Sequence, residues 1–122
     1  MANLFVWTDI PVKDLGRAMK FYSGVLAIEI KEQKYPDFSL GLFPENGGNM
    51  SGCLYVEKKD ISSDMGPLLY FSVDGRIDDA ANKVTEFGGT ILAQKTQIGE
   101  YGYRVVAKDS EGNRIALHST KG

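Results

Sequence analysis

The chain has 122 residues, of which 43% are hydrophobic and 25% charged, and its formal net charge is −2. This length and composition are typical of one globular domain and argue against a disordered chain. The small negative charge and the scattered Lys and Arg residues do not form the basic surface that nucleic-acid binding requires. We therefore expect no nucleic-acid partner.

The beginning of the sequence and the length of its apolar runs indicate where in the cell the protein is located. Residues 1–7 lack the basic start of a signal peptide, and no apolar run approaches the roughly 20 residues of a membrane span. Cys53, the one cysteine, lies in an apolar strand-like run, where a small buried side chain is expected rather than a reactive thiol. We expect a cytoplasmic protein without membrane association.

The first half reads as strand, helix, strand and hairpin. Residues 4–11 predict a strand on which Trp7 and Asp9 share one face. A helix is expected to begin at its cap Asp14 and to end at Gly24. A strand over 25–32 follows, and strands over 38–43 and 50–56 flank a turn rich in Asn and Gly.

The second half, after a polar linker over 57–67, repeats this order. A strand over 68–73 precedes a helix capped by Asp74 or a neighbour, with its apolar stripe running from Ile77 to Phe87. Gly88 and Gly89 end this helix, and strands follow over 90–94, 103–107 and 114–118. The repeated order predicts internal duplication within a single domain of residues 1–122, with halves of about 1–57 and 68–122. The expected fold class is α+β, with paired βαβββ modules forming a curved mixed sheet around a cavity and both helices outside.

Two stretches carry a resemblance to a known family. Residues 10–22, IPVKDLGRAMKFY, and residues 109–119, DSEGNRIALHS, resemble the strand-to-helix entry and the terminal D-x-x-G-N-x-[IL]-x-L hairpin of the vicinal-oxygen-chelate superfamily. This superfamily contains glyoxalases, bleomycin resistance proteins and dioxygenases, and the chain is most similar to its small bacterial glyoxalase-like members. The resemblance implies a cavity that usually holds a divalent metal, with ligands from both halves.

The residues at the corresponding ligand positions depart from that pattern. Trp7 stands where the first strand usually has His or Gln, Leu68 where the second half has His, and Ala116 where the last strand has Glu. The remaining position falls near Gly41 or Leu42. Indole, alkyl and methyl groups do not ligate such a cation. We therefore expect no cofactor and no standard metal site, although a divalent metal held by other residues stays possible.

Several aromatic and acidic residues are candidates for ligand binding. Trp7 offers a flat surface and Asp9 a charge beside it, and the alternative is that Trp7 fills the core while Asp9 pairs with a Lys or Arg. Three tyrosines could line the same cavity and present their hydroxyl groups to a ligand: Tyr70, Tyr101 and Tyr103.

Two further residues are candidates for catalysis. His118, the one histidine, could be a general base or a displaced metal ligand, or a hydrogen-bonded residue at a strand end. Glu100 lies between Gly99 and Gly102 in a loop and could contact a ligand or belong to a solvated turn.

Three functions remain open from the sequence. The first is a small-molecule-binding protein without the usual metal site, whose ligand is planar or cationic. The second is a lyase, isomerase or dioxygenase that uses a metal or acid/base chemistry at altered residues such as His118 and Glu100. The third is a non-catalytic homodimeric interaction module. A homodimer is expected in each case, by analogy and because half-sheets leave edges that pairing can cover.

Overall fold

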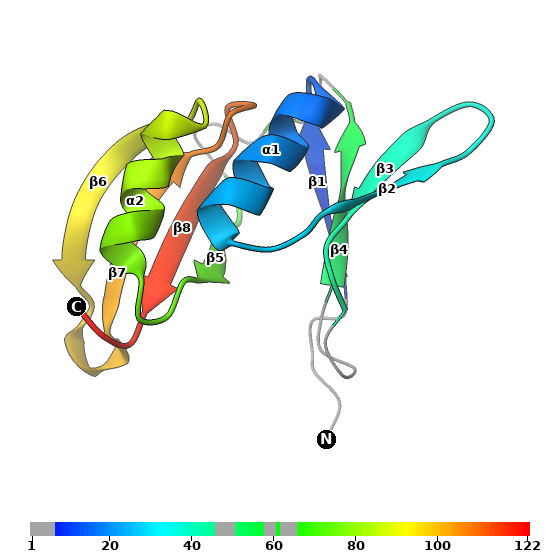
Figure 1. The fold of residues 1–122 in the computed structure, drawn as a ribbon. Coiled ribbons are helices and arrows are strands. Elements are labelled where there is room, and N and C mark those ends of the chain that lie inside the picture. The colour runs from blue at the N-terminus through cyan, green and yellow to red at the C-terminus, as the bar shows by residue number, and fades with distance from the viewer. Residues whose placement is uncertain (1–6, 46–50, 58–60, 62–65) are drawn as a thin grey trace.

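The computed structural model describes residues 7–45, 51–57, 61 and 66–122. Within these residues the chain forms two α-helices, one short 3-10 helix and eight strands, arranged as two successive βαβββ modules (Figure 1). The first module consists of β1 (Trp7–Val12), α1 (Leu15–Leu26), β2 (Lys31–Lys34), β3 (Ser39–Leu42) and β4 (Ser51–Val56). The second consists of β5 (Leu69–Ser72), α2 (Ile77–Glu86), β6 (Thr90–Gln97), the 3-10 helix η1 (Gly99–Tyr101), β7 (Tyr103–Lys108) and β8 (Arg114–Ser119).

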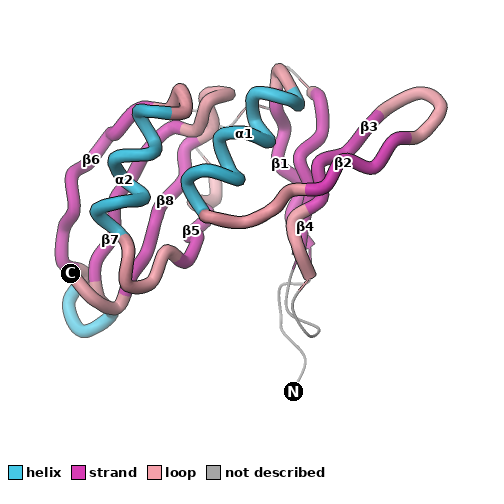
Figure 2. Tube along the Cα trace, in the orientation of Figure 1, coloured by secondary structure: helices cyan, strands magenta, loops and turns pink. Residues whose placement is uncertain are grey.

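Each module forms its own mixed four-stranded sheet. The order is β1-β4-β3-β2 in the first sheet and β5-β8-β7-β6 in the second. In both sheets the first and last strands of the module pair in parallel and the remaining pairs are antiparallel. The tube view shows the two sheets on either side of the molecule, with the β2–β3 hairpin extending away from the second module (Figure 2). The α+β class and the paired βαβββ modules are therefore confirmed.

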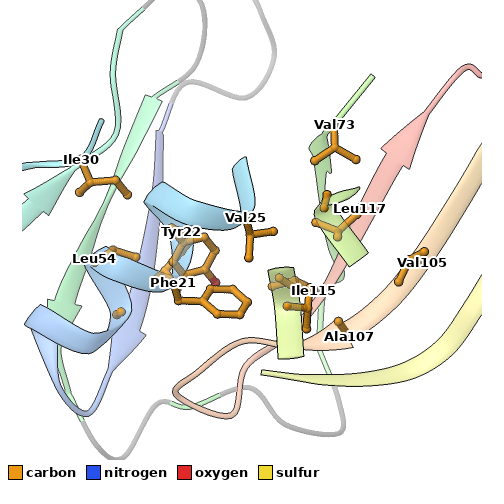
Figure 3. Close-up of a cluster of buried hydrophobic side chains, with 14 of the residues drawn as sticks. Phe21, Tyr22, Val25, Ile30, Leu54, Val73, Val105, Ala107, Ile115 and Leu117 are labelled. Atoms are coloured by element: carbon orange, nitrogen blue, oxygen red, sulfur yellow. The ribbon is translucent and has the colours of Figure 1, made fainter. Parts of the chain in front are cut away.

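Each helix covers one face of its own sheet, and the two helices also contact each other. Apolar side chains at helical spacing, such as Ala18, Phe21 and Val25 of α1, are buried, and so are Ile77 and Val84 of α2. They form one cluster with the helix-facing residues of both sheets (Figure 3). Since this core fills one side of each sheet, the opposite side of each sheet stays without a helix.

The first helix ends later than the sequence predicts. Val25 is fully buried and continues the helix to Leu26, and Ala27 caps it in a left-handed conformation with φ of 55°. The predicted strand over 25–32 is therefore wrong at its start, because Val25 belongs to the apolar stripe of a helix. Gly24 lies inside this helix, where a β-carbon would come within 2.4 Å of the Phe87 ring. The glycine permits close packing of α1 against the end of α2.

The second helix begins without a side-chain cap. Arg76 occupies its N-cap position and makes no capping hydrogen bond, so the cap predicted at Asp74 or a neighbour is wrong. Asp74 instead accepts hydrogen bonds from the backbone and side chain of Thr120. The carboxylates of Asp78 and Asp79 in the first turn favour the positive end of the helix dipole.

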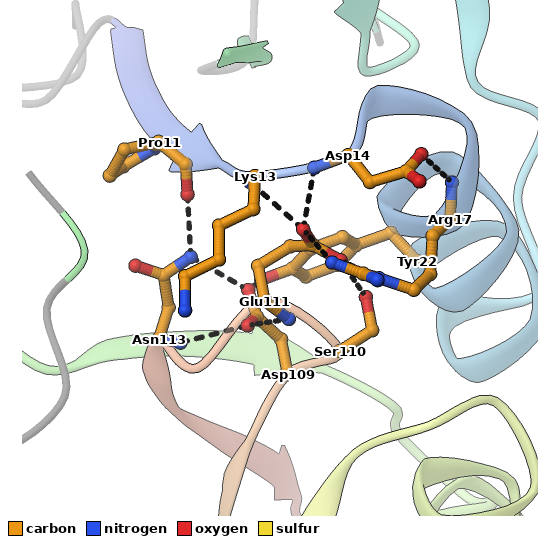
Figure 4. Close-up of polar contacts among 9 residues, drawn as sticks. All are labelled: Pro11, Lys13, Asp14, Arg17, Tyr22, Asp109, Ser110, Glu111 and Asn113. Atoms are coloured by element: carbon orange, nitrogen blue, oxygen red, sulfur yellow. Dashed lines mark hydrogen bonds and ion pairs between the residues drawn. The ribbon is translucent and has the colours of Figure 1, made fainter. Parts of the chain in front are cut away.

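A buried polar cluster joins the two modules at the β7–β8 turn (Figure 4). The Glu111 carboxylate accepts hydrogen bonds from the backbone N–H groups of Lys13 and Asp14, at 2.8 Å each, and pairs with Arg17 at 2.7 Å. The Asp109 carboxylate accepts the Tyr22 hydroxyl at 2.6 Å. We call this set of residues the 109–113 clamp: Lys13, Asp14, Arg17, Tyr22, Asp109, Ser110, Glu111 and Asn113.

The two buried acids of the clamp, Asp109 and Glu111, each accept several hydrogen bonds. The Asp109 carboxylate also accepts the backbone N–H groups of Glu111 and Asn113 and the Asn113 side chain, which in turn donates to the Pro11 carbonyl. The clamp therefore ties the start of α1 to the second module.

None of the described helices is long and apolar enough to cross a membrane.

Candidate functional site

The face of each sheet that carries no helix is called here its open face. On the first sheet the alternation of strand residues places Trp7 and Asp9 of β1 on this face, opposite Ser51 and Cys53 of β4. Trp7, Asp9 and Cys53 border a pocket of about 700 Å³, called here the Trp7 pocket. Its lining consists of Trp7, Asp9, Asp37, Phe38, Ser39, Leu40, Cys53, Tyr55 and Val56.

A hydrogen-bonded trio fixes the base of the Trp7 pocket. The indole Nε1 of Trp7 donates to Asp9 Oδ1 at 2.7 Å, and the Cys53 thiol donates to the same oxygen at 3.3 Å. The described residues give the other oxygen, Oδ2, no hydrogen-bond donor. Trp7 is nevertheless 48% exposed, so its ring is held in place without being covered. Of the two roles considered for Trp7, filling the core therefore does not fit.

Cys53 has no nucleophilic character in this environment. Cys53 is only 4% exposed to solvent. Burial, followed by the hydrogen bond to Asp9 and the Asp9 charge, raises the pKa of the thiol to about 11. The group therefore stays protonated at neutral pH and donates to Asp9, as a buried structural cysteine does.

The β2–β3 turn contributes residues that the sequence did not single out for function. Phe38, which is 57% exposed, stacks on Tyr35 with ring centroids 4.8 Å apart, and Phe38 lines the Trp7 pocket together with Asp37. An exposed aromatic next to an acid in a turn is the signal that could have indicated this role. The pocket thus combines aromatic rings with two carboxylates.

The second sheet has an open face of different chemistry. Tyr70 pairs with Ala116, and His118 lies between Ser72 and Arg104, so these side chains share that face. The Arg104 guanidinium donates to the Tyr70 hydroxyl and lies 5.9 Å from the centroid of its ring.

His118 and Glu100 do not form an acid/base pair in the described residues. His118 Nε2 donates to the backbone carbonyl of Tyr101 at 2.6 Å, a bond that fixes the proton on that nitrogen. Glu100 is exposed in η1, and Tyr101 beside it is 70% exposed. The histidine therefore holds the η1 turn against β8.

Tyr103 lies on the other face of the second sheet. It alternates with Val105 and Ala107, which belong to the core, and it packs against that core. The structure therefore brings Trp7 and Asp9 together, places Tyr70 and His118 on another face, and separates Tyr103 from both groups.

The two open faces approach each other between the modules. A cavity of about 420 Å³ is lined by Asp9 and Tyr55, which also line the Trp7 pocket, and by Leu69 and Arg114 of the second module. A smaller apolar pocket of about 230 Å³ lies beside it, lined by residues that include Phe43 and Tyr70.

The described residues do not fit the metal site of the resembled superfamily. They contain no group of three or more His, Cys, Asp or Glu side chains placed to hold a metal ion. At the expected ligand positions, Trp7 donates its N–H to Asp9 and Ala116 ends at a methyl group. Neither side chain offers a lone pair to a cation.

The family of the chain follows from its sequence. Residues 4–117 match the model of the Glyoxalase/Bleomycin resistance protein/Dioxygenase superfamily, and the chain belongs to this superfamily. The search of curated proteins found no match.

Solved structures share the fold at low sequence identity. A hypothetical protein from S. aureus is 19% identical with a TM-score of 0.74, over 98% of this chain and 95% of that one. The fosfomycin resistance protein FosX from Listeria monocytogenes is 15% identical with a TM-score of 0.72, over 98% and 94%. A glyoxalase I mutant from Zea mays is 18% identical with a TM-score of 0.73, over 94% of this chain and 45% of that one. These similarities establish the fold alone.

Proposed function

We propose that the chain binds a flat, positively charged small molecule in the Trp7 pocket, without the metal site of its superfamily. The observation that carries the proposal is the composition of this pocket. It combines the exposed rings of Trp7 and Phe38 with the carboxylates of Asp9 and Asp37, and its volume of about 700 Å³ suits a small organic molecule.

The chemistry of the lining supports a cation rather than an anion. Indole is the aromatic face that attracts cations most strongly, and the Asp9 Oδ2 atom adds a negative charge beside it. No Lys or Arg is found among the described residues that line this pocket. An organic cation would therefore find ring faces and carboxylates within one pocket, whereas an anion would be repelled.

A homodimer is part of the proposal. All four residues of β2, at the edge of the first sheet, are exposed, and an uncovered edge strand is suited to pairing with another chain. Size-exclusion chromatography with light scattering tests this point, because a dimer gives about 27 kDa against the 13.4 kDa of one chain.

We also propose that the protein is located in the cytoplasm.

Titration with 10-methylacridinium tests binding, with the neutral acridone of similar shape as the matched ligand. Trp7 is the one tryptophan of the chain, so quenching of its fluorescence reports directly on the pocket. Calorimetry in the presence of EDTA supplies the affinity independently. We expect saturable binding of the cation, at least tenfold tighter than that of acridone.

Two variants locate the bound cation. Asp9→Asn keeps an acceptor for Trp7 and removes the charge, so we expect about tenfold weaker binding, which corresponds to about 1.4 kcal/mol. Glu86→Gln removes one charge from the exposed end of α2 and is the control. Equal affinities for acridinium and acridone, or equal losses in both variants, would contradict the proposal.

A further inference from the structure

The strands of the second sheet differ in charge from the rest of the chain. β5, β6, β7 and β8, all within the described residues, contain no Asp or Glu, although the whole chain has 16 such acids. The same strands carry Lys95, Arg104, Lys108 and Arg114. The second sheet is therefore cationic in a protein of net charge −2.

The register places most of these cations on the open face. Arg104 pairs with His118, and Lys108 pairs with Arg114, whereas Val106 and Ala116 form the row between them. Two cationic rows thus flank a row of small apolar side chains. Lys95 does not belong to this face, because its ammonium lies 5.9 Å from the Tyr103 ring on the core side and pairs with Asp78.

The described residues contain three ion pairs, Arg17–Glu111, Arg76–Asp79 and Lys95–Asp78. None of them involves a cation of this open face. Glu100 is exposed in the neighbouring η1 turn, and Asp109 points to Tyr22 on the helix side. The buried Nε of Arg114 has no hydrogen-bond partner among the described residues.

Arg104 reaches across the middle of this face. It starts on β7 and its guanidinium contacts the Tyr70 hydroxyl on β5, and β8 lies between these two strands. Tyr70 pairs with Ala116, the β8 residue at which the superfamily usually has a ligating Glu. The guanidinium therefore lies over β8 on the open face of the sheet.

We infer that the open face of the second sheet binds a small oxyanion, a carboxylate or a phosphate group, on the guanidinium of Arg104. Its planar fork matches two oxygens of such a group, and the Tyr70 hydroxyl keeps one end of the fork oriented. Neither Arg104 nor Tyr70 lines the Trp7 pocket, and the inference does not rest on the function proposed for that pocket.

Calorimetric titration with sodium benzoate and with inorganic phosphate tests the inference, each in EDTA and again with added Mn²⁺. We expect at least one of the two anions to bind in EDTA, with an affinity that Mn²⁺ does not raise. Benzoate alone would identify a carboxylate ligand, phosphate alone a phosphate ligand, and both a general oxyanion site. No binding of either anion in EDTA, or binding that requires Mn²⁺, would overturn the inference.

Variants assign the bound anion to Arg104. We expect Arg104→Gln to weaken binding at least tenfold, and Arg104→Lys to weaken it less, because lysine keeps the charge and loses the fork. Lys20→Gln on α1 removes the same charge elsewhere and is the control. Melting temperatures of all three variants show whether each is folded. Equal affinity of Arg104→Gln and Lys20→Gln would overturn the assignment, and unchanged acridinium binding in Arg104→Gln would show that the two sites are independent.

Discussion

The 109–113 clamp and the open faces use charged residues in opposite ways. In the clamp the Glu111 side chain is completely buried and its carboxylate accepts donors from Lys13, Asp14, Arg17 and Ser110. On the open faces the described residues give Asp9 Oδ2 no donor and give Arg104 no carboxylate partner. Charged groups whose hydrogen-bonding atoms are all satisfied stabilise the structure. Charged groups with unused hydrogen-bonding atoms are available to a ligand.

This comparison separates the residues that identify the family from those proposed to carry function. The D-x-x-G-N stretch that carried much of the resemblance forms the clamp, so its acids contribute to stability. The residues proposed to bind ligands are those that depart from the family pattern, such as Trp7, or that it does not mention, such as Arg104. A family match of this kind therefore indicates the fold better than the ligand.

The largest expected effect on stability comes from Glu111→Gln. The substitution leaves an amide N–H₂ group against Arg17 and removes a buried charge that several donors share, so we expect a loss of about 3 kcal/mol in the free energy of unfolding. Urea denaturation measures the loss, with Glu86→Gln as the control at an exposed position. A loss below 0.5 kcal/mol would show that the clamp does not stabilise the fold.

The pH dependence of stability gives a second test of Glu111. Burial alone would raise the pKa of this carboxyl, but hydrogen bonds from Arg17, Ser110 and the backbone of Asp14 and Lys13 outweigh burial and lower the pKa from 4.5 to about 2. The stabilisation is therefore complete above pH 4.5 and is lost as the pH falls toward 2.

Denaturation between pH 5 and pH 2 measures this loss. Over this range the wild type is expected to lose roughly 3 kcal/mol more stability than Glu111→Gln does. Parallel pH curves for the two proteins would contradict the assignment of this titration to Glu111.

A smaller effect is expected for Tyr22→Phe. Burial, followed by the charge of Asp109, raises the pKa of the Tyr22 hydroxyl well above its usual value, so the group stays a donor to Asp109. Its removal leaves Asp109 with its bonds from Asn113 and Glu111, and we expect a loss of about 1 to 2 kcal/mol in urea denaturation. A loss as large as that of Glu111→Gln would indicate that the two carboxylates act as one unit.

The smallest expected effect on stability comes from Asp9→Asn. The amide still accepts the Trp7 N–H, and no ion pair of the described residues is broken, so the free energy of unfolding should change by less than about 0.5 kcal/mol. Thermal unfolding of this variant beside the wild type measures the change. A loss of several kcal/mol would place Asp9 with the clamp rather than with the open faces.

Local patterns in the sequence predicted the repeated elements because such elements depend on short-range periodicity. The cap at Asp14 and the apolar stripe predicted from Ile77 to Phe87 both appear in the structure, with Phe87 just after the end of α2 and packed against the core. Alternation along β7 also places Tyr103 on the same side as Val105 and Ala107, so the sequence already carries the signal that this tyrosine packs against the core.

Contacts between distant parts of the chain could not be predicted in the same way. The clamp joins Glu111 to Lys13 and Asp14, which precede it by 98 and 97 positions, and no local pattern encodes that pairing. Arg104 was likewise not recognised, because its role depends on reaching across β8 to Tyr70. The candidates Trp7 and Asp9 were found together only because they lie two residues apart on one strand.

Melting temperature and acridinium affinity, measured side by side for Glu111→Gln and Asp9→Asn, test the central claim most directly. The account predicts that Glu111→Gln lowers the melting temperature and leaves the affinity of the folded protein unchanged. It predicts that Asp9→Asn weakens binding about tenfold at an unchanged melting temperature. The reverse pattern, or the same change in both variants, would contradict the separation of a stabilising clamp from ligand-binding open faces.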